Sequence, residues 1–302
     1  MKIAHFTDVH FHRGQQVGGL VGKRGLGLAN LYLRGRRHSF DADRIVPQLV
    51  RDILGAQPDL VIFSGDLTAL STEAEFLVAY EALEPLLRQV HTIVIPGNHD
   101  RYAPDAHRRM EAHFGPWMIG GVASGRNVWE GGDVESTWPR CFQKGDLFVH
   151  TTDASRPGVL SEGRHHVGEL DRLRSQIKES GANQSIVVGH YPVWDRDGTP
   201  YRHRGRSLRD QEKLARVLDE AAPVAYLHGH EHAWFYLQRE QPVGVPHYVN
   251  CGSSSYVGTR PGRSANYFLL EFSEGLMTAI QRHEWDGSRF LLQEDQLGAR
   301  SA

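Results

Sequence analysis

The chain has few cysteines for its length. Of its 302 residues only Cys141 and Cys251 are cysteine, and neither lies in a Cys-x-x-Cys pair. Two cysteines cannot build the disulfide framework typical of small extracellular domains. We therefore expect two ordinary thiols, a reducing compartment and a cytoplasmic location.

Long hydrophobic runs and a strong net charge are also missing. No window approaches eighteen uninterrupted apolar residues, so no transmembrane helix is expected. The formal net charge is −2 and the pI is about 6.8, which excludes a global field that would attract nucleic acid, so no nucleic-acid partner is expected. The first chemically suggestive residue is already Asp8, which leaves no room for a cleaved leader, so the mature chain is expected to start at Met1.

What the chain does have is a succession of short apolar runs that alternate with amphipathic segments. Helical spacing of apolar residues predicts helices near 45–54, from Thr72 onward, near 167–177 and near 214–221, and Thr72 with Glu75 has the pattern of a capping box. Strands are expected between and before these helices, at 2–6, 59–64, 92–95, 147–151, 185–188 and 224–227. Strands that alternate with helices indicate an α/β layered fold.

Beyond about residue 230 the pattern changes. The expected strands at 235–237, 247–250, 267–272, 276–281 and 290–292 are joined by Gly, Pro and Ser without helical segments. These strands predict a second, mostly antiparallel sheet. Because no linker divides the chain persuasively, residues 1–302 are expected to form a single domain.

The chain is rich in histidine, with 18 residues, and several of them follow predicted strands. Asp8 and His10 end the first strand, where residues two apart would point to the same side. Four later strand ends have glycine beside a polar side chain, and glycine permits a tight turn and close backbone approach. These pairs are Gly65-Asp66, Gly97-Asn98, Gly189-His190 and His228-Gly229-His230.

These side chains outnumber the ligands that one tetrahedral ion can use. A pair of divalent ions about 3.5–4 Å apart that share a carboxylate could use most of them. Nitrogen and hard oxygen ligands without thiolate suit manganese, iron or zinc, and the sequence does not choose among the three. Two such ions would make a locally positive pocket for a phosphate oxygen, and would lower the pKa of a bridging water so that hydroxide could attack phosphorus.

The ordered motifs Asp8-Val9-His10, Gly65-Asp66-Leu67-Thr68, Gly97-Asn98-His99-Asp100, Gly189-His190 and His228-Gly229-His230 resemble those of the calcineurin-like metallophosphoesterases. The resemblance implies a four-layer α-β-β-α sandwich of two mixed sheets flanked by helices. It also implies that Asp8, His10 and His230 hold one ion, that Asn98, His190 and His228 hold the other, and that Asp66 bridges. His99 would act on the leaving oxygen, with Asp100 orienting its ring, and His12 or His232 could reach the pocket rim.

Between residues 13 and 38 lies a segment rich in Gly, Leu and Arg that contains no acidic residue. Its glycines favour a solvated loop. The alternative is a basic, amphipathic lid over the site that grips an anionic substrate or touches an anionic membrane surface.

The motifs narrow the expected function to hydrolysis of phosphodiester or phosphoanhydride bonds in small molecules. Gly-Asp-Leu-Thr and Gly-Asn-His-Asp look most similar to class III cyclic-nucleotide phosphodiesterases and their bacterial relatives. The group resembling UDP-2,3-diacylglucosamine pyrophosphatases is the alternative, since a lipid substrate would give segment 13–38 a purpose at the inner face of a membrane. A catalytically inactive binding scaffold on the same fold is the alternative from another class, and the oligomeric state stays open.

Overall fold

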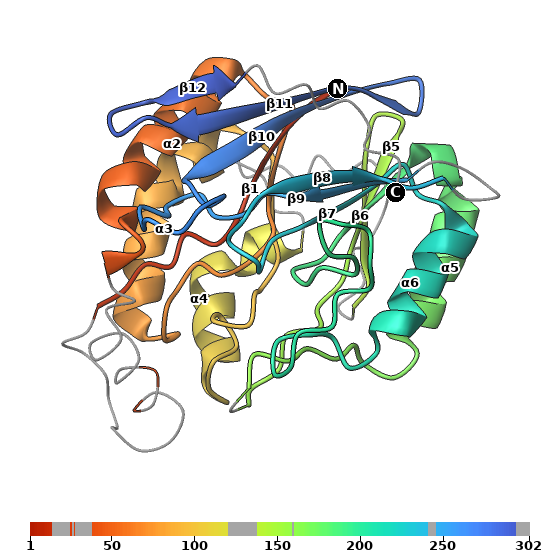
Figure 1. Ribbon diagram of the computed structural model, residues 1–302, viewed down its shortest axis with the longest axis horizontal. Coiled ribbons are helices and arrows are strands. Elements are labelled where there is room, and N and C mark those ends of the chain that lie inside the picture. Colours follow the sequence, from red (N-terminus) through yellow and green to blue (C-terminus); the bar gives the residue numbers. More distant parts are fainter. Residues whose placement is uncertain are drawn as a thin grey trace.

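Two mixed β-sheets lie face to face, and helices cover their outer surfaces (Figure 1). The structure is a computed structural model that describes residues 1–13, 25, 27, 38–119, 138–158, 160–240 and 246–293. The predicted α/β sandwich of two mixed sheets flanked by helices is confirmed. Segment 13–38, predicted as a loop or lid, lies outside the described residues except for its ends and two glycines.

The first sheet combines the start of the chain with its end. Its strand order is β12-β11-β10-β1-β2-β3, in which β1 runs parallel to β2 and antiparallel to β10. The strands are β1 (Lys2–Phe6), β2 (Leu60–Phe63), β3 (Thr92–Val94), β10 (Asn266–Ser273), β11 (Leu276–Trp285) and β12 (Phe290–Gln293).

The second sheet is built from the middle of the chain, in the order β4-β5-β6-β7-β9-β8. Strands β5, β6, β7 and β9 are parallel, and an antiparallel strand closes each edge. The strands are β4 (Arg140–Lys144), β5 (Leu147–Thr151), β6 (Ser185–Val188), β7 (Ala225–His228), β8 (Phe235–Gln238) and β9 (His247–Asn250).

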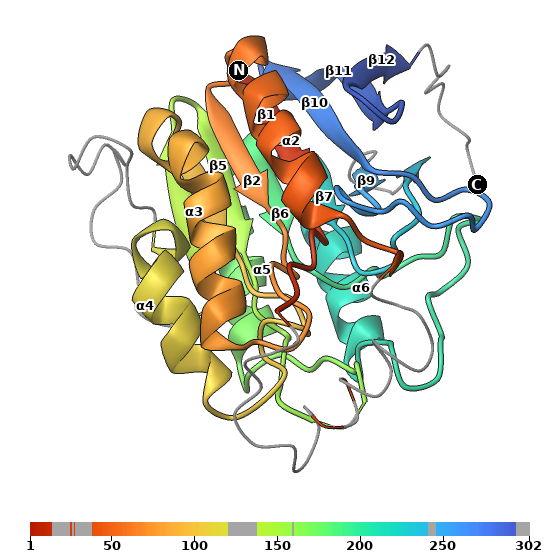
Figure 2. The same ribbon diagram turned by 90° about the vertical axis from the view of Figure 1, so that its left-hand side faces the viewer.

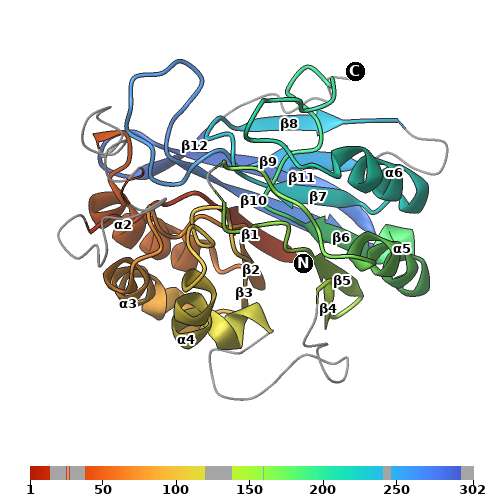
Figure 3. The ribbon, with the colours of Figure 1, turned by 90° about the horizontal axis from the view of Figure 1, so that it is seen from below.

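The helices form two groups on opposite sides of the sandwich (Figure 3). Helices α2 (Ala42–Ala56), α3 (Glu73–Gln89) and α4 (Ala106–Met118) lie on the side of the first sheet, and Figure 2 shows α2 and α3 in front of it. Helices α5 (Glu169–Ser180) and α6 (Gln211–Ala221) pack together on the side of the second sheet, where a short 3₁₀ turn, η2 (Ala182–Gln184), precedes β6. The predicted capping box is present at α3, where Thr72 accepts from the Glu75 N–H and Glu75 accepts from the Thr72 N–H.

Alternation along the central strands divides the apolar residues between two cores. In β6, Ile186 and Val188 belong to the large cluster between the sheets, whereas Val187 belongs to the cluster under α5 and α6. Strands that are buried on both faces read as continuous apolar runs, and this is why the sequence pattern predicts them well. No helix in the described part of the chain is long and apolar enough to cross a lipid bilayer.

The structure differs from the sequence expectation in the assignment of the last strands. They do not form one separate sheet, because β8 and β9 extend the second sheet whereas β10 to β12 extend the first. Strand pairing depends on tertiary contacts that periodicity does not encode. Helix α4 and strand β4 were not predicted, since α4 contains Gly115 and Pro116 and β4 reads Arg-Cys-Phe-Gln-Lys.

Candidate metal centre

The polar residues predicted at the strand ends meet at one edge of the sandwich. Asp8 follows β1 and Asp66 follows β2, while Asn98 lies beyond β3 in the same sheet. His190 and His230 follow β6 and β7 of the facing sheet. The carboxyl ends of parallel strands lie at the same edge of a sheet, so both sheets deliver side chains to one place.

Backbone conformation, rather than strand alternation, aims these side chains. Nine non-glycine residues in the described part of the chain have positive φ, and five of them gather here: Asp8, His10, Asp66, His230 and His232. Strand β1 has ended at Phe6, so Asp8 (φ 53°) and His10 (φ 51°) converge because both adopt the left-handed conformation. Such backbone costs free energy in non-glycine residues, and a cluster of it is typical of a functional site.

The glycines beside these residues are required because a side chain at their positions would clash with neighbouring atoms. A Cβ atom on Gly97 would lie 2.2 Å from Asp66 Oδ1, and one on Gly229 would lie 2.2 Å from Asp8 Oδ2. Gly65 and Gly189 are equally confined, by the Gly97 backbone and by the Tyr226 hydroxyl. The sequence expectation that glycine allows close approach at these turns is therefore met at all four positions.

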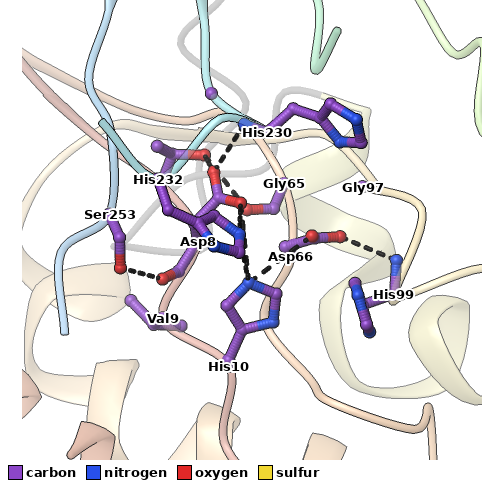
Figure 4. Close-up of polar contacts among 12 residues, drawn as sticks. Asp8, Val9, His10, Gly65, Asp66, Gly97, His99, His230, His232 and Ser253 are labelled. Carbon is purple, nitrogen blue, oxygen red and sulfur yellow. Dashed lines mark hydrogen bonds and ion pairs between the residues drawn. The ribbon is translucent and has the colours of Figure 1, made fainter. Parts of the chain in front are cut away.

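The first donor set contains Asp8, His10, Asp66 and His232, whose ligand atoms all lie within 4.8 Å of one another (Figure 4). His10 Nε2 lies 3.0 Å from His232 Nε2, 3.5 Å from Asp8 Oδ1 and 3.6 Å from Asp66 Oδ2. His232 Nε2 lies 3.1 Å from Asp8 Oδ1. All four residues are buried.

The second donor set surrounds His190. Its Nε2 lies 3.5 Å from Asp66 Oδ2, 3.2 Å from Asn98 Oδ1 and 3.3 Å from His230 Nδ1. Asp66 Oδ2 therefore faces both sets, while Asp66 Oδ1 accepts the backbone N–H of His99 at 2.7 Å. One carboxylate oxygen common to two donor sets is the arrangement that a bridging ligand needs.

These separations fit bound cations. Ligand distances of about 2.0–2.2 Å place neighbouring ligand atoms roughly 3.0–3.6 Å apart around one ion. Backbone carbonyls also orient the histidine rings. His10 Nδ1 lies 3.3 Å from the Thr68 carbonyl oxygen, and His190 Nδ1 lies 2.8 Å from that of Ser64. His230 uses its other nitrogen, Nε2, which lies 2.9 Å from the Arg206 carbonyl oxygen. Each bond leaves the other ring nitrogen as a lone pair that faces the centre. Asp8 Oδ1 is a buried oxygen with no hydrogen bond from the described residues, and a bound cation would satisfy it.

The carboxylates of the centre stay ionised because imidazole rings lie beside them. Burial opposes ionisation of Asp8, but the imidazoles of His10 and His232 hold its pKa well below the usual range. Burial likewise opposes protonation of His190, but the charge of Asp66 raises the pKa of that imidazole to about 9. The carboxylates thus attract positive charge into a buried site, and a divalent cation would supply it.

Three further residues of the predicted site are His228, His230 and Asp100. His228, predicted to hold the second ion with Asn98 and His190, lies inside β7, where its ring stacks on Tyr226 at 5.1 Å. The His230 backbone N–H donates to Asp8 Oδ2 at 2.9 Å, whereas its ring Nδ1 lies 3.3 Å from His190 Nε2, so the ring lies beside the second donor set although the resemblance implies the first ion for it. Asp100 accepts N–H groups from the backbone of residues 66–68 and from Gly97, and so fixes the turn that presents Asp66.

His232 is the residue that the sequence analysis did not place among the ligands. The signal was the spacing Gly229-His230-Glu231-His232, in which two histidines with left-handed backbone fall two residues apart, as in Asp8-x-His10. Ser253 and Ser255 were missed as well. Their hydroxyls donate to the carbonyls of Asp8 and Val9 at 2.7 and 2.6 Å and tie the loop after β9 to the centre.

A cavity of about 330 Å³ opens onto the two donor sets. His99 lies in its wall, with Nδ1 2.7 Å from the Ala69 carbonyl oxygen and the ring stacked on Tyr102. Phe40 and Tyr256 form an aromatic part of the wall. The remaining lining residues are Ser39, Asp66, Asn98, Ser161, Arg206, His230, His232, Arg260 and Arg263.

Two adjoining sets of carboxylate and imidazole donors lie beside one cavity, and such sets suit a pair of divalent cations. The chain belongs to the calcineurin-like phosphoesterase family, whose model matches residues 1–234.

Curated relatives are similar over part of their length. A probable cyclic nucleotide phosphodiesterase of Rhodococcus erythropolis is 30% identical over 212 residues, which are 67% of this chain and 58% of that protein. Tartrate-resistant acid phosphatase type 5 of Oryctolagus cuniculus is 32% identical over 127 residues, which are 41% of this chain and 36% of that protein. The chain thus spans less than two thirds of the length of these relatives.

Solved structures share the fold at low sequence identity. A dimetal phosphatase from Danio rerio superposes with a TM-score of 0.60 at 12% identity, and the match covers 96% of this chain and 98% of that one. Purple acid phosphatase PPD1 from yellow lupin superposes with a TM-score of 0.57 at 12% identity and covers 97% of this chain and 52% of that one.

Proposed function

We propose that the chain is a binuclear-metal-dependent hydrolase of phosphodiester or phosphoanhydride bonds in small molecules. The observation that carries the proposal is the position of Asp66 Oδ2, 3.6 Å from His10 Nε2 and 3.5 Å from His190 Nε2. In this proposal Asp8, His10, Asp66 and His232 hold one ion, and Asp66, Asn98, His190 and His230 hold the other. When bound, two such ions polarise a phosphoryl group and lower the pKa of bound water.

The chain's own residues would position the substrate and move the leaving-group proton. His99 donates Nδ1–H to the Ala69 carbonyl, and as a doubly protonated imidazolium it would give its Nε2 proton to the departing oxygen. Asn98 and Asp66 line the same cavity as His99. Phe40 and Tyr256 offer an apolar surface on which a nucleobase or another planar group could pack.

The test is reconstitution of the metal-free protein separately with Mn, Fe and Zn. We expect two ions per chain by elemental analysis and hydrolysis of bis(p-nitrophenyl) phosphate, which no metal-free sample should show. A screen of cyclic nucleotides, acyclic diesters and diphosphates would then assign the substrate. Stoichiometric metal binding with no hydrolysis of any of these esters would contradict the proposal.

His99→Ala tests the proposed acid directly. The rate should fall by about 10²–10⁴ because general acid catalysis contributes a factor of that order, while both ions remain bound. His113→Ala is the matched control, since His113 pairs with Glu73 on the surface between α3 and α4. An inactive binding scaffold would bind metal with no activity for His99→Ala to remove.

The lipid-pyrophosphatase alternative depends on segment 13–38, which the structure largely does not describe. It would be supported if the protein cleaved a UDP-lipid and lost that activity, but not aryl-diester hydrolysis, on deletion of residues 15–36. The cytoplasmic location likewise stays a proposal, supported by the low cysteine content of the chain.

A further inference from the structure

Three arginines line the active-site cavity on the wall that the metal ligands leave open. They are Arg206, from the loop before α6, and Arg260 and Arg263, from the loop after β9. Asp66 is the sole carboxylate among the described residues that line this cavity. We refer to Arg206, Arg260 and Arg263 as the arginine cluster.

Both loops are tied to the metal centre. Arg206 Nη2 donates to the His230 carbonyl at 3.1 Å, and the Arg206 carbonyl accepts from His230 Nε2 at 2.9 Å. The second loop is held at its base, where the Ser254 N–H donates to the Thr7 carbonyl and the Asn266 N–H donates to the Ser253 carbonyl. Arg206 is therefore held beside His230, and the loop that carries Arg260 and Arg263 is anchored at its base next to the metal centre.

Most of the positive charge in the cluster is not neutralised within the described part of the chain. Glu231 lies 3.4 Å from Arg206 and also accepts the Tyr201 hydroxyl. No described carboxylate oxygen lies within 4.0 Å of the guanidinium of Arg260 or Arg263. Burial lowers the pKa of Arg263, and the charges of Arg260 and Arg206 act in the same direction, against the attraction of Glu231. Three guanidinium groups around one cavity, set against the single ion pair of Arg206 with Glu231, favour an anionic ligand.

We propose that the arginine cluster is a second anion subsite that makes organic diphosphates the preferred substrates of this chain, a proposal that rests on the proposed function. A simple or cyclic phosphodiester carries one negative charge, and the metal centre already receives it. A diphosphate diester has a second phosphoryl group directly bonded through oxygen to the one at the metal centre. This second group can accept hydrogen bonds from the guanidinium groups of the arginine cluster. Water would add its oxygen to one phosphorus, the anhydride P–O bond would break, and two phosphomonoesters and a proton would result.

The experiment compares the wild-type protein, an Arg260→Gln/Arg263→Gln double variant, and an Arg202→Gln control. Arg202 is an exposed arginine that pairs with Glu212 outside the cavity. Binding of methylenediphosphonate and methylphosphonate to the metal-loaded proteins is measured by calorimetry, with metal content checked after each titration. The rates kcat/KM are measured for a nucleoside diphosphate ester and for bis(p-nitrophenyl) phosphate.

We expect the double variant to lose at least about tenfold in diphosphonate affinity and in kcat/KM for the diphosphate ester, since one charge-assisted hydrogen bond is worth a factor of that order. Methylphosphonate binding and aryl-diester hydrolysis should change by much less. Equal losses for both ligands, or no loss, would overturn the subsite even if the protein hydrolyses diesters. Selective loss of diphosphonate binding in a protein that hydrolyses nothing would keep the subsite and reject the proposed activity.

Discussion

At the scale of single residues, the ring nitrogen that each histidine can offer to a metal ion is the one that does not bond to a backbone carbonyl. His10 and His190 donate through Nδ1 and face the centre with Nε2, whereas His230 is reversed, with Nε2 on the Arg206 carbonyl. His228 has a buried Nδ1 without any hydrogen-bond partner and aromatic neighbours on two sides. Burial lowers the pKa of His228 to about 3, so its ring is neutral.

The contrast between His232 and His228 gives the first prediction. His232→Ala removes a nitrogen that lies 3.1 Å from Asp8 Oδ1, so it should weaken binding of one ion by at least about a hundredfold, because loss of even an outer-shell partner costs 10–100-fold. His228→Gln should keep two ions per chain. Metal content after dialysis decides, with near-ultraviolet circular dichroism to check folding. Retention of both ions by the His232 variant would refute this ligand assignment.

His150 provides a prediction on pH. It is buried in β5 with Nε2 3.2 Å from Ser185 Oγ, and burial lowers its pKa to about 4, below the usual 6.5. The unfolded chain therefore takes up this proton first, so stability is complete above pH 6.5 and falls as the pH drops toward 4. Between pH 7 and pH 5 the loss in unfolding free energy from this group should be about 2 kcal/mol.

Urea unfolding of the wild type and of His150→Leu at pH 7, 6 and 5 measures this loss. The leucine variant lacks the titrating group, so the difference in unfolding free energy between the two proteins should shift by about 2 kcal/mol across that range. Parallel pH profiles would mean that His150 is not held neutral in the folded state.

At the scale of helices and strands, the turns after the parallel strands determine the site. Gly229 is confined by Asp8 Oδ2 at 2.2 Å and Thr7 Oγ1 at 2.4 Å, measured from a Cβ built on the glycine. Gly55, an exposed glycine inside α2, has no atom within 4 Å of such a Cβ. Alanine should therefore clash with its neighbours at position 229 and fit without strain at position 55.

We predict that Gly229→Ala displaces the Asp8 carboxylate and lowers metal affinity, whereas Gly55→Ala stabilises the protein. The gain at Gly55 should be about 0.5–1 kcal/mol because alanine has the higher helix propensity. Metal titration and thermal unfolding of both variants are the measurements. Unchanged metal affinity in Gly229→Ala would show that the turn can relax around a methyl group.

At this scale the sequence predicts some features well and others poorly. Strands β1, β5, β6 and β9 agree with their predicted ranges, because apolar runs mark them directly. The pairing of β1 with β10 joins residues more than 260 positions apart, and no local pattern encodes that contact. The sequence analysis predicted that Asp8 and His10 would point to the same place, and it argued this from strand alternation. The structure shows another cause, because both residues have left-handed backbone beyond the end of the strand.

At the scale of the whole molecule, the metal centre joins the two halves of the sandwich. Asp8, Asp66 and Asn98 come from the half built on the first sheet, and His190, His230 and His232 come from the half built on the second. One apolar cluster also fills the space between the sheets. We propose on this basis that residues 1–302 form one domain in which bound ions act as a link between the sheets.

Removal of the ions should therefore lower the stability of both sheets together. At a free metal concentration about 100 times Kd the ions contribute about 2.7 kcal/mol per site, so chelation should lower the melting temperature by several degrees. Circular dichroism and tryptophan fluorescence should report the same shifted midpoint. Asp66→Asn, which weakens the oxygen common to both donor sets, should melt nearly independently of chelator. A wild-type protein that retains two ions by elemental analysis, yet melts at the same temperature with and without chelator, would contradict the link.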